Sequence, residues 1–432
     1  MTEQLKEGYK KTEVGIIPNE WTPKAYGELF HFLTTSSFSR DELSEEGEVR
    51  CVHYGDIHTK YHQFLDFSIG FNSFIDLERG KKYPLVKDGD IIMADASEDY
   101  SGIGKSVEVK NLGNKLAISG LHTFLLRDKN GDFEAGFKAY IHSMTPVKKS
   151  MDRLATGLKV YGVSKGNLKT VLVPVPPPEE QKAIATALSD VDTLITNLDK
   201  LIAKKKAIKQ GAMQRLLKSP AQGGQRLPGF EGEWVETTLG QIILRHQLGG
   251  NYPNYEVENS YPLIKMGNLN RGTISLSKLE FISNNIVPNE NDRLRFGDLL
   301  FNTRNTLDLV GKIAVWRNEL DTAFFNSNIM RIEFKESYVG STFFMNYLLN
   351  TKKYLTALKA VATGTTSVAA IYTRDLLKLE LIIPTPEEQK AIASILSDMD
   401  REIESLERKK SKYLRIKQGM MQELLTGKTR LV

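Results

Sequence analysis

The feature that most constrains this chain is a segment that occurs twice, 208 residues apart. The eight residues Pro-Glu-Glu-Gln-Lys-Ala-Ile-Ala fill positions 178–185 and return unchanged at positions 386–393. The offset then holds without a gap, and 23 of the 41 positions from 178 to 218 are identical to their counterparts. Self-similarity at a fixed period indicates that one structural unit has been used twice. A chain of 432 residues is also too long for one ordinary core, so two or three domains are expected.

Weaker correspondences precede both copies of the repeated segment. Trp21 corresponds to Trp234, and the tripeptide Ala-Thr-Gly at positions 155–157 returns at 362–364. The preceding segments therefore share a fold as well, but they have diverged further. Such a pattern is expected if the repeated segments meet the same partner surface while the diverged parts meet different ligands. Uneven drift after a duplication is the alternative.

The repeated segments are predicted to be long helices. Each begins with Pro followed by two Glu, which suits a helix start because Pro fits the first turn and negative charge favours the N-terminus. Apolar residues then recur at the 3.5-residue spacing of a coiled-coil seam. These are Ile184, Leu188, Val191, Ile195 and Leu198 in the first segment, and Ile392, Leu396, Met399, Ile403 and Leu406 in the second. About 40 residues give a rod of roughly 60 Å. We predict that the two rods pair antiparallel and act as a ruler between the two diverged parts.

The seam is interrupted at Lys205 and Lys410, and basic residues crowd the later half of each predicted helix. Two interpretations are open for these cations, a solvated helix face or a surface beside DNA phosphates. A symmetric rod also offers two equivalent docking faces, so two copies of one partner can bind. A plain structural bundle without a partner is the alternative.

The diverged parts have the pattern of mixed strand and helix, so the predicted fold class is α+β. Short apolar runs bounded by Gly, Asp and Pro indicate buried strands at 90–93, 171–175, 299–302 and 379–383, and helices are expected at 139–154 and 341–360. The predicted boundaries are a first globular domain (1–175), a central helix (176–218), a linker (219–227), a second globular domain (228–383), a distal helix (384–427) and a tail (428–432).

Basic, amide and aromatic residues stand out in the predicted loops of both diverged parts. Arg, Lys and Asn pair with base edges in the major groove of DNA, while Ser, Thr and Lys suit phosphates. Any one such residue is as easily ordinary surface, and recurrence at matching places is what favours the set. The candidate DNA-binding residues are His53, Tyr54, His58, Lys60, Tyr61, Lys105 and Lys159 in the first part, and Lys265, Asn268, Asn270, Arg271, Arg304, Asn305, Lys312, Thr365 and Thr366 in the second.

Composition excludes several classes of protein. The net charge of +5 permits an anionic partner without requiring one. The single cysteine, Cys51, rules out an intrachain disulfide and a Cys-based zinc site, and no metal site is expected. No apolar run approaches the roughly 18 to 20 residues of a membrane span, and the first residues lack a signal-peptide pattern. We therefore expect a cytoplasmic protein.

Catalysis by this chain is not expected. Asp95 together with Glu108 and Lys110 resembles the carboxylate pair and lysine of a metal-dependent nuclease. The second copy has Val315-Trp316-Arg317 at the corresponding place, so the pattern does not repeat. A stand-alone nuclease and a protein-binding coiled-coil scaffold without sequence readout are the two alternatives to a non-catalytic DNA-binding subunit.

The order of domain, helix, domain, helix carries a family resemblance. Its residues are Pro-Pro-x-Glu-Gln-x-x-Ile-Ala at 177–185, the second copy at 386–393, and Leu-Leu-Thr-Gly-Lys at 424–428. Together they resemble the specificity subunit of type I restriction–modification enzymes. The resemblance covers essentially the full chain. The doubled helix motif is specific, whereas the target-domain matches are individually weak.

The resemblance implies that each target-recognition domain reads one half of a split, asymmetric site in double-stranded DNA, with the helices fixing the gap. Readers of this kind contact half-sites about one helical turn, roughly 34 Å, apart. It also implies two methyltransferase subunits docked on the helices and two restriction subunits in the larger complex. S-adenosylmethionine, ATP and Mg²⁺ would then be used on those partners, with no cofactor on this chain. In agreement, the chain contains no Asn-Pro-Pro-Phe or Asp-Pro-Pro-Tyr tetrapeptide of adenine methyltransferases.

Overall fold

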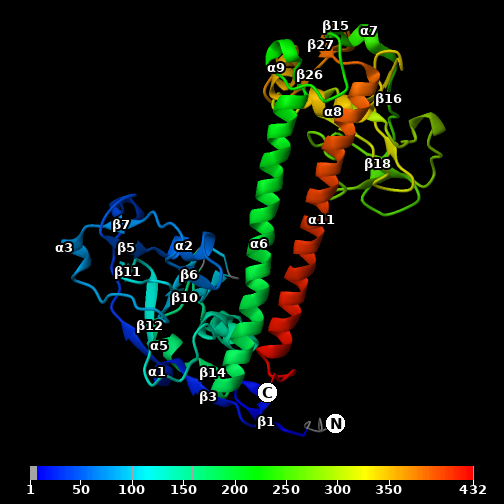
Figure 1. The fold of residues 1–432 in the computed structure, drawn as a ribbon. Coiled ribbons are helices and arrows are strands. Elements are labelled where there is room, and N and C mark those ends of the chain that lie inside the picture. Colours follow the sequence, from blue (N-terminus) through cyan, green and yellow to red (C-terminus); the bar gives the residue numbers. More distant parts are fainter. Residues whose placement is uncertain (1–6, 100–101, 158–159, 432) are drawn as a thin grey trace. The chain divides into compact units, whose positions relative to one another are not determined.

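The computed structural model describes residues 7–99, 102–157 and 160–431. By packing, the chain divides into two units, Met1–Asp199 with Arg408–Val432, and Lys200–Glu407. Each unit contains one globular domain, the first half of the long helix that follows it, and the second half of the other long helix (Figure 1). The chain therefore passes from one unit to the other inside each long helix.

The first unit is built on a five-stranded sheet in the order β4-β12-β8-β10-β6, antiparallel except for the β10–β6 pair. A smaller sheet, β11-β5-β7, and the pairs β13-β9 and β14-β3 complete the domain, and the hairpin β1–β2 precedes it. The strands are β1 (Tyr9–Thr12), β2 (Gly15–Pro18), β3 (Thr22–Ala25), β4 (Phe30–Leu33), β5 (Val49–Val52), β6 (Phe64–Asp66), β7 (Phe74–Ile75), β8 (Ile91–Ala94), β9 (Ala96–Ser97), β10 (Ser106–Lys110), β11 (Leu116–Ser119), β12 (Thr123–Asp128), β13 (Tyr161–Gly162) and β14 (Leu172–Val175).

The second unit has a four-stranded sheet, β16-β24-β20-β22, a sheet β17-β19-β18-β23, a small sheet β21-β26-β25, and the pair β15-β27. The strands are β15 (Val235–Thr238), β16 (Ile243–Leu248), β17 (Asn254–Tyr255), β18 (Pro262–Ile264), β19 (Glu280–Ile282), β20 (Leu299–Asn302), β21 (Arg304–Asn305), β22 (Ile313–Val315), β23 (Phe324–Phe325), β24 (Ile329–Phe334), β25 (Thr363–Gly364), β26 (Ala369–Ala370) and β27 (Glu380–Ile383).

The two globular domains share one topology. The order β4-β12-β8-β10 in the first matches β16-β24-β20-β22 in the second, and β11-β5-β7 matches β23-β18-β19. The central strands β8 and β20 are buried along their whole length, because other strands pair with both of their edges and helices or loops cover their faces. The predictions of an α+β fold and of an internal repeat are therefore confirmed.

The two helices predicted inside the globular domains are each broken once. The segment expected as one helix at 139–154 is a 3₁₀ turn, Lys138–Ser143, followed by α4 (Thr145–Leu154). Pro146 lies in the first turn of α4. Because proline has no amide hydrogen and disfavours helical backbone in the residue before it, one helix cannot run through this point without a break. The segment at 341–360 is α8 (Thr342–Leu349) and α9 (Lys352–Ala360), separated where Asn350 ends α8 and Thr351 begins α9.

The other helical elements are short. They are α1 (Tyr26–Leu29), α2 (Tyr54–Thr59), α3 (Leu77–Gly80), α5 (Lys165–Thr170), α7 (Leu239–Ile242) and α10 (Thr373–Leu376), with 3₁₀ turns at Arg40–Glu42, Pro220–Gln222 and Glu290–Asp292. The long helices are α6 (Pro178–Leu216) and α11 (Pro386–Leu424), of 39 residues each and hence about 58 Å long.

Ion pairs show that α6 and α11 run antiparallel within each unit. In the first unit Lys417 pairs with Asp192 at 2.5 Å, and Lys410 pairs with Asp199 at 2.6 Å. As the residue number rises along one helix it falls along the other, which is the antiparallel order that the sequence predicts. In the second unit Lys209–Asp400 is the counterpart of Lys417–Asp192, and Lys205–Glu402 at 2.6 Å and Lys206–Glu407 at 2.7 Å are further cross-helix pairs.

These pairs give some of the basic helix residues a place. Lys205 and Lys410, which interrupt the apolar seam, bind carboxylates of the opposite helix. Such cross-helix contacts can set the register of the two helices. Cations such as Lys200, Lys204 and Lys412 stay exposed.

The predicted seam residues are all buried or half-buried. Ile184 and Leu188 belong to the core of the first globular domain, and Ile392 and Leu396 belong to the core of the second. Val191, Leu198 and Ile403 are buried farther along the helices, while Ile195, Met399 and Leu406 are half-buried. The start of each helix thus packs on its own domain and, in the same core, on the last turns of the other helix, where Leu424 and Leu425 lie in the first unit and Leu216 and Leu217 in the second.

The repeated Glu-Gln pair explains how each helix is fixed to its domain. Glu180 is fully buried, and its carboxylate accepts hydrogen bonds from Trp21 Nε1 at 2.7 Å and from Arg430 Nε at 2.6 Å. In the second unit the buried carboxylate of Glu388 accepts from Arg226, with the shortest bond at 2.9 Å. An Arg that follows the end of one helix therefore neutralises a Glu at the start of the other.

The neighbouring glutamines bind backbone groups in the same way in both units. Gln181 Nε2 donates to the carbonyls of Pro176 and Asp132, both at 2.9 Å, and its Oε1 accepts from the Glu134 amide. Gln389 repeats this arrangement with Pro384, Tyr338 and Gly340. Since buried polar groups must find partners, the repeated motif is explained by these bonds at the helix–domain junction.

Candidate nucleic-acid interface

In the second unit the sheet β21-β26-β25 gathers several candidate residues. Arg304 and Asn305 form β21, which pairs with β26. The turn between β25 and β26 carries Thr365 and Thr366, both exposed, and the Thr366 carbonyl accepts from the Leu307 amide at 3.1 Å. Within the described residues the exposed guanidinium of Arg304 has no hydrogen bond or ion pair. This small sheet therefore carries an exposed cation on β21 and two exposed hydroxyls on the β25–β26 turn.

A second group of candidates lies on the loop after β18. Arg271 is held by a hydrogen bond from Nη2 to the Asp308 carbonyl at 3.1 Å. Burial lowers the pKa of Lys312, and the charge of Arg271 lowers it further, so the two cations are close together. Partial burial also lowers the pKa of Arg271. Both side chains therefore form a region of positive potential, and an anion there would relieve their repulsion. Asn270 is exposed on the same loop.

Buried asparagines shape this loop. Asn268, which is 3% exposed, donates to the carbonyls of Ser275 at 3.0 Å and Lys278 at 3.2 Å. Asn346, fully buried on α8, donates to the Gly272 carbonyl at 3.1 Å. Gly272 has φ +89°, which favours glycine. The structure therefore gives Asn268 a supporting position beneath the loop.

Lys265 and Asn305 also have partners inside the domain. Lys265 Nζ donates to both carboxylate oxygens of Glu280, at 2.9 and 2.8 Å, and to Asn254 at 3.0 Å. Asn305 Oδ1 accepts from the Thr306 amide at 2.9 Å. In this unit the exposed cations of the predicted set are Arg271 and Arg304.

In the first unit the predicted residues of α2 form an aromatic cluster. The Tyr54 ring lies 4.6 Å from that of His53 and 5.4 Å from that of His122, measured between centroids. His58 Nε2 lies 2.9 Å from the Ala96 carbonyl, and Lys105 Nζ donates to the His58 carbonyl at 3.0 Å. Four of the predicted side chains are thus connected through α2 and β9.

Other predicted residues of this unit serve local structure. His53 is buried at the N-cap of α2, where its Nδ1 accepts from the Gly55 amide at 3.2 Å. Lys60 pairs with Asp56 at 2.9 Å. Tyr61 is half-buried, and burial raises its pKa to about 12. Lys159 lies outside the described residues.

His122 belongs to the cluster but was not among the predicted residues. It is exposed, has φ +53°, and its Nδ1 lies 3.2 Å from Asp95 Oδ1. Burial raises the pKa of Asp95, while the nearby His122 acts in the opposite direction. No pattern in the sequence marked His122, although the structure repeats its position: the Asp95 amide donates to the His122 carbonyl just as the Thr303 amide donates to the Asn328 carbonyl.

The two candidate surfaces occupy the same topological place. In the first unit β9 pairs with β13, and a bridge joins Thr156 to Gly162. In the second unit β21 pairs with β26, which pairs with β25. Both surfaces combine a strand that follows the central sheet strand with the segment that follows α4 or α9. The two domains thus place their candidate surfaces at the same position in the fold, whereas the side chains on the two surfaces differ.

The nuclease pattern does not assemble into a metal site. The buried carboxylate of Glu108 accepts hydrogen bonds from the amides of Gly136 and Ala139, both at 2.9 Å. Across the sheet Glu108 lies opposite Ile91, four residues before Asp95. Among the residues that the structure describes, no three His, Cys, Asp or Glu side chains are grouped to hold a metal ion.

Cys51 is buried, and burial raises its pKa to about 11. In the described ranges, no helix is long and apolar enough to cross a membrane.

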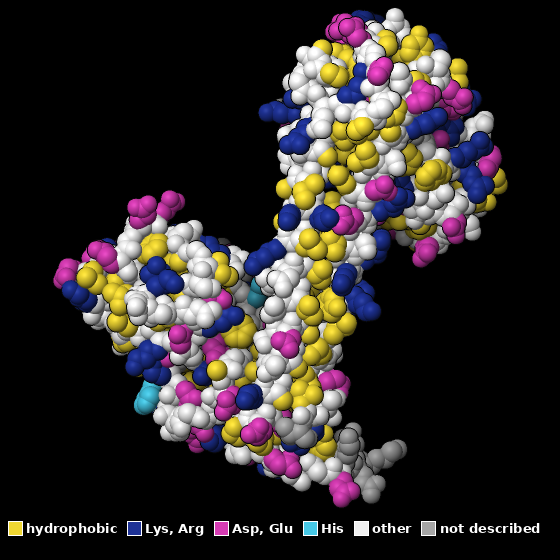
Figure 2. Space-filling view, viewed as in Figure 1, with side chains coloured by type: hydrophobic (Ala, Val, Ile, Leu, Met, Phe, Trp, Pro, Cys, Tyr) yellow, Lys and Arg dark blue, Asp and Glu magenta, His cyan; other side chains and the backbone are white. Residues whose placement is uncertain are grey.

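The long helices expose an apolar stripe. Leu194, Leu201 and Ile208 recur every seven residues on α6 and are 37–47% exposed. Figure 2 shows hydrophobic side chains at the surface of the paired helices, interspersed with Lys and Arg. The positions 208 residues later on α11 are Glu402, Lys409 and Ile416, so the stripe is only partly repeated.

Comparison with known proteins gives a consistent result. The family model described as type I restriction modification DNA specificity domain matches twice, at residues 18–210 and 231–414. A putative type I restriction enzyme specificity subunit of Methanocaldococcus jannaschii is 25% identical, covering 99% of this chain and 97% of the relative. The EcoKI specificity subunit of Escherichia coli is 20% identical over 82% of this chain and 76% of its own length. The crystal structure of a type I restriction–modification S subunit from M. genitalium has a TM-score of 0.59 at 15% identity, covering 98% of this chain and 97% of that chain.

Proposed function

Because this chain belongs to the family of type I restriction–modification DNA specificity subunits, we propose that its two globular domains each read one half of a split DNA site. The observation that carries the proposal is the recurrence of the two candidate surfaces at one topological place in diverged domains. Since their side chains differ, the two half-sites are expected to differ in sequence. The role is recognition, and the family and the relatives are named for specificity.

The second domain offers the sharper base-reading candidates. Arg304 is exposed on β21, in the same small sheet as the turn that carries Thr365 and Thr366, and its guanidinium is suited to bidentate contact with guanine. Arg271 and Lys312 lie on neighbouring loops and suit phosphates or bases. In the first domain, Tyr54, His58, His122 and Lys105 form the corresponding candidate surface.

The long helices are proposed to dock the other subunits of the complex. The exposed stripe of Leu194, Leu201 and Ile208 supports a helix–helix contact with a partner, because apolar side chains at a seven-residue spacing form such seams. We propose two methyltransferase subunits on this surface and two restriction subunits in the larger complex. S-adenosylmethionine, ATP and Mg²⁺ would be used on those partners.

The test replaces Arg304 with Ala and measures DNA binding by the chain assembled with methyltransferase subunits. A base contact should cost about 1–3 kcal/mol and relax sequence preference at positions of one half-site only. The matched control is Arg245→Ala, because Arg245 is an exposed cation of the same unit that pairs with Glu333.

Two results would contradict the assignment. An equal loss of affinity at every sequence, with a shallower dependence on salt, would make Arg304 a phosphate contact only. Assembled complexes without any sequence preference would favour a protein scaffold over a DNA-reading subunit.

A further inference from the structure

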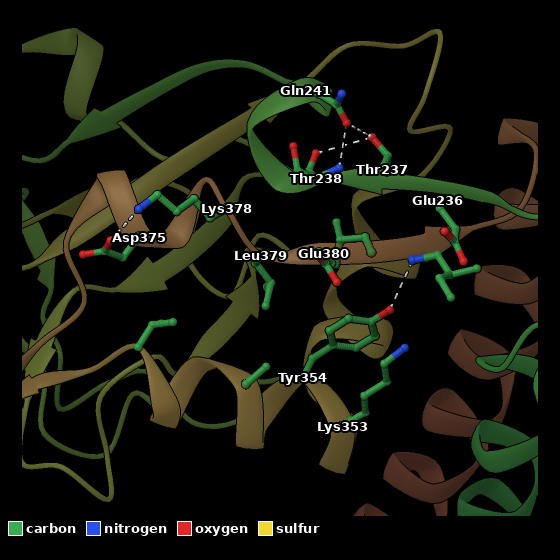
Figure 3. A pocket seen from close by; sticks show the side chains of 14 residues that line it. Glu236, Thr237, Thr238, Gln241, Lys353, Tyr354, Asp375, Lys378, Leu379 and Glu380 are labelled. Carbon is green, nitrogen blue, oxygen red and sulfur yellow. Dashed lines mark hydrogen bonds and ion pairs between the residues drawn. The ribbon is translucent and has the colours of Figure 1, made fainter.

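A groove in the second unit lies between α9 and β27 and continues to the end of α6. Its first part, drawn in Figure 3, has a volume of about 920 Å³ and is bounded by β15, α9 and β27. Its second part, of about 780 Å³, lies between the last turns of α6 and the α8–α9 junction. Lys353, Tyr354 and Ile382 line both parts, so the groove is continuous. Tyr354 is fixed between them, since its hydroxyl accepts from the Ile382 amide at 3.3 Å.

The second part of the groove is apolar at its base and basic at its rim. Met213, Leu217, Tyr354 and Ile382 supply apolar surface. The charged side chains that line it are Lys218, Lys352 and Lys353, all exposed, and its described lining contains no carboxylate. The first part of the groove does contain carboxylates, those of Glu236, Asp375 and Glu380, with Lys353 and Lys378. In the second part the three lysines lie around an apolar surface without a carboxylate in the lining, which favours an occupant that is apolar and is acidic where it passes this part.

In the first unit the chain covers the corresponding surface itself. There α4 takes the place of α9, and Pro146, Ser150 and Leu154 lie where Lys353, Ala357 and Val361 line the groove. The turn of the β1–β2 hairpin, residues 13–15, lies against these α4 residues and forms one wall of a smaller groove of about 480 Å³. Val14 packs against the core there.

The strands of the hairpin extend this cover to the end of α11. Ile17 is buried in one cluster with Leu424 and Leu425, and the Tyr9 hydroxyl donates to the Gly427 carbonyl at 2.8 Å. The counterpart of Leu425 in the second unit is Leu217, which lines the groove. The hairpin thus covers in the first unit the surface that remains a groove in the second.

The segment that precedes β15 takes a different course. After α6 it forms the 3₁₀ turn Pro220–Gln222, the Gln225 amide donates back to the Arg215 carbonyl at 2.8 Å, and Arg226 binds Glu388. It therefore supplies the ion pair of its unit without forming a hairpin over the groove.

We propose that this groove binds an extended or hairpin segment of a partner protein, apolar where it enters the groove and acidic where it passes the three lysines. The hairpin of the first unit is the internal example, since it presents Val14 and Ile17 to the protein and carries Glu13 at its turn. A DNA duplex is disfavoured as the occupant because the base of the groove is apolar. The inference does not depend on which DNA sequence the chain reads.

The test uses the full chain and a synthetic hairpin peptide of residues 8–19 that carries a fluorophore. A second peptide has Lys10 and Lys11 both replaced by Glu, which makes it acidic. Fluorescence anisotropy should show the acidic peptide binding about fivefold more tightly at low salt, since exposed ion pairs are individually weak. The preference should disappear at about 0.5 M salt, where such pairs are screened.

Variants of the chain separate the effect of the groove's positive charge on peptide binding from the effect of its shape. Lys352→Glu/Lys353→Glu should abolish the preference for the acidic peptide. Ala357→Trp should weaken both peptides about tenfold by filling the first part of the groove. The matched control, Lys278→Glu/Lys359→Glu, makes the same change of charge at exposed lysines outside the groove lining and should alter neither affinity.

Three outcomes would overturn the proposal. One is no binding of either peptide up to about 1 mM, the weak end of measurable affinity. Another is peptide binding that the groove variants leave unchanged. The third is displacement of the peptide by a short DNA duplex whose own affinity falls with Lys352→Glu/Lys353→Glu but not with Ala357→Trp, because the lysines would then be phosphate contacts.

Discussion

Replacing Arg430 with Ala leaves the buried carboxylate of Glu180 without its ion-pair partner. Glu180 is fully buried, and two of its three side-chain hydrogen bonds come from Arg430, at 2.6 and 2.9 Å. Breaking a buried ion pair by removing one partner costs about 3–5 kcal/mol. Arg430 is 25% exposed and Trp21 still donates one bond, so water and the indole compensate in part. We expect the free energy of local unfolding at this junction to fall by about 2–3 kcal/mol, which raises the local opening equilibrium about 30- to 150-fold.

The internal repeat supplies the control for this prediction. Hydrogen–deuterium exchange should show faster exchange at the start of α6, residues 178–188, and unchanged exchange at the start of α11, residues 386–396. Arg226→Ala should give the converse pattern, because Arg226 is the partner of Glu388. Arg430→Lys should recover part of the protection, since it keeps a charge but loses the bidentate geometry.

Equal acceleration of exchange in both helices after Arg430→Ala would refute this reasoning, since it would mean that the pair stabilises the whole chain rather than one junction. Unchanged exchange in both would show that the carboxylate finds another partner.

The remaining predictions concern the seam, the helix–domain contacts and pH. Leu198→Asp buries an unpaired charge and should cost about 3 kcal/mol or more by thermal unfolding, whereas Leu194→Asp on the exposed stripe should leave the melting temperature unchanged; equal effects would contradict the assigned faces. Tyr347→Phe removes the hydroxyl that donates to Asp400 at 2.6 Å and should cost about 1–2 kcal/mol in urea unfolding, and a neutral result would show that water replaces it. Burial lowers the pKa of His142 from 6.5 to about 4. The contribution of the neutral imidazole to the free energy of unfolding is therefore complete above pH 6.5 and falls by about 1.4 kcal/mol per pH unit as the pH drops towards 4. His142→Gln should remove that part of the slope, and an unchanged slope would contradict the linkage.

The long helices and the duplicated fold were predictable because their signals are local. Heptad spacing and Pro at the helix start are patterns within short stretches of sequence. The offset of 208 is found by comparing the sequence with itself. The cross-helix ion pairs were not predictable, because pairing Lys410 with Asp199 requires knowing the register of two helices. Breaks within the shorter helices were missed where a new helix begins, at Thr351 before α9 and with Pro146 in the first turn of α4.

The candidate interface was only partly predictable. Residue type identified Arg304 and Thr365, which the structure brings to one three-stranded sheet. Residue type alone did not distinguish a side chain that caps a helix or supports a loop, as His53 and Asn268 do, from one that reaches solvent. His122 was missed because Asp95 and Tyr54 become its neighbours only after folding.

Single-base mapping of adenine methylation tests the proposed function most directly, in cells that express this chain with the methyltransferase subunit proposed to dock on it. The account predicts a split motif methylated in both halves, lost when the gene is deleted and altered in one half alone by Arg304→Ala. A stable complex that leaves no split motif in the methylated DNA would contradict it.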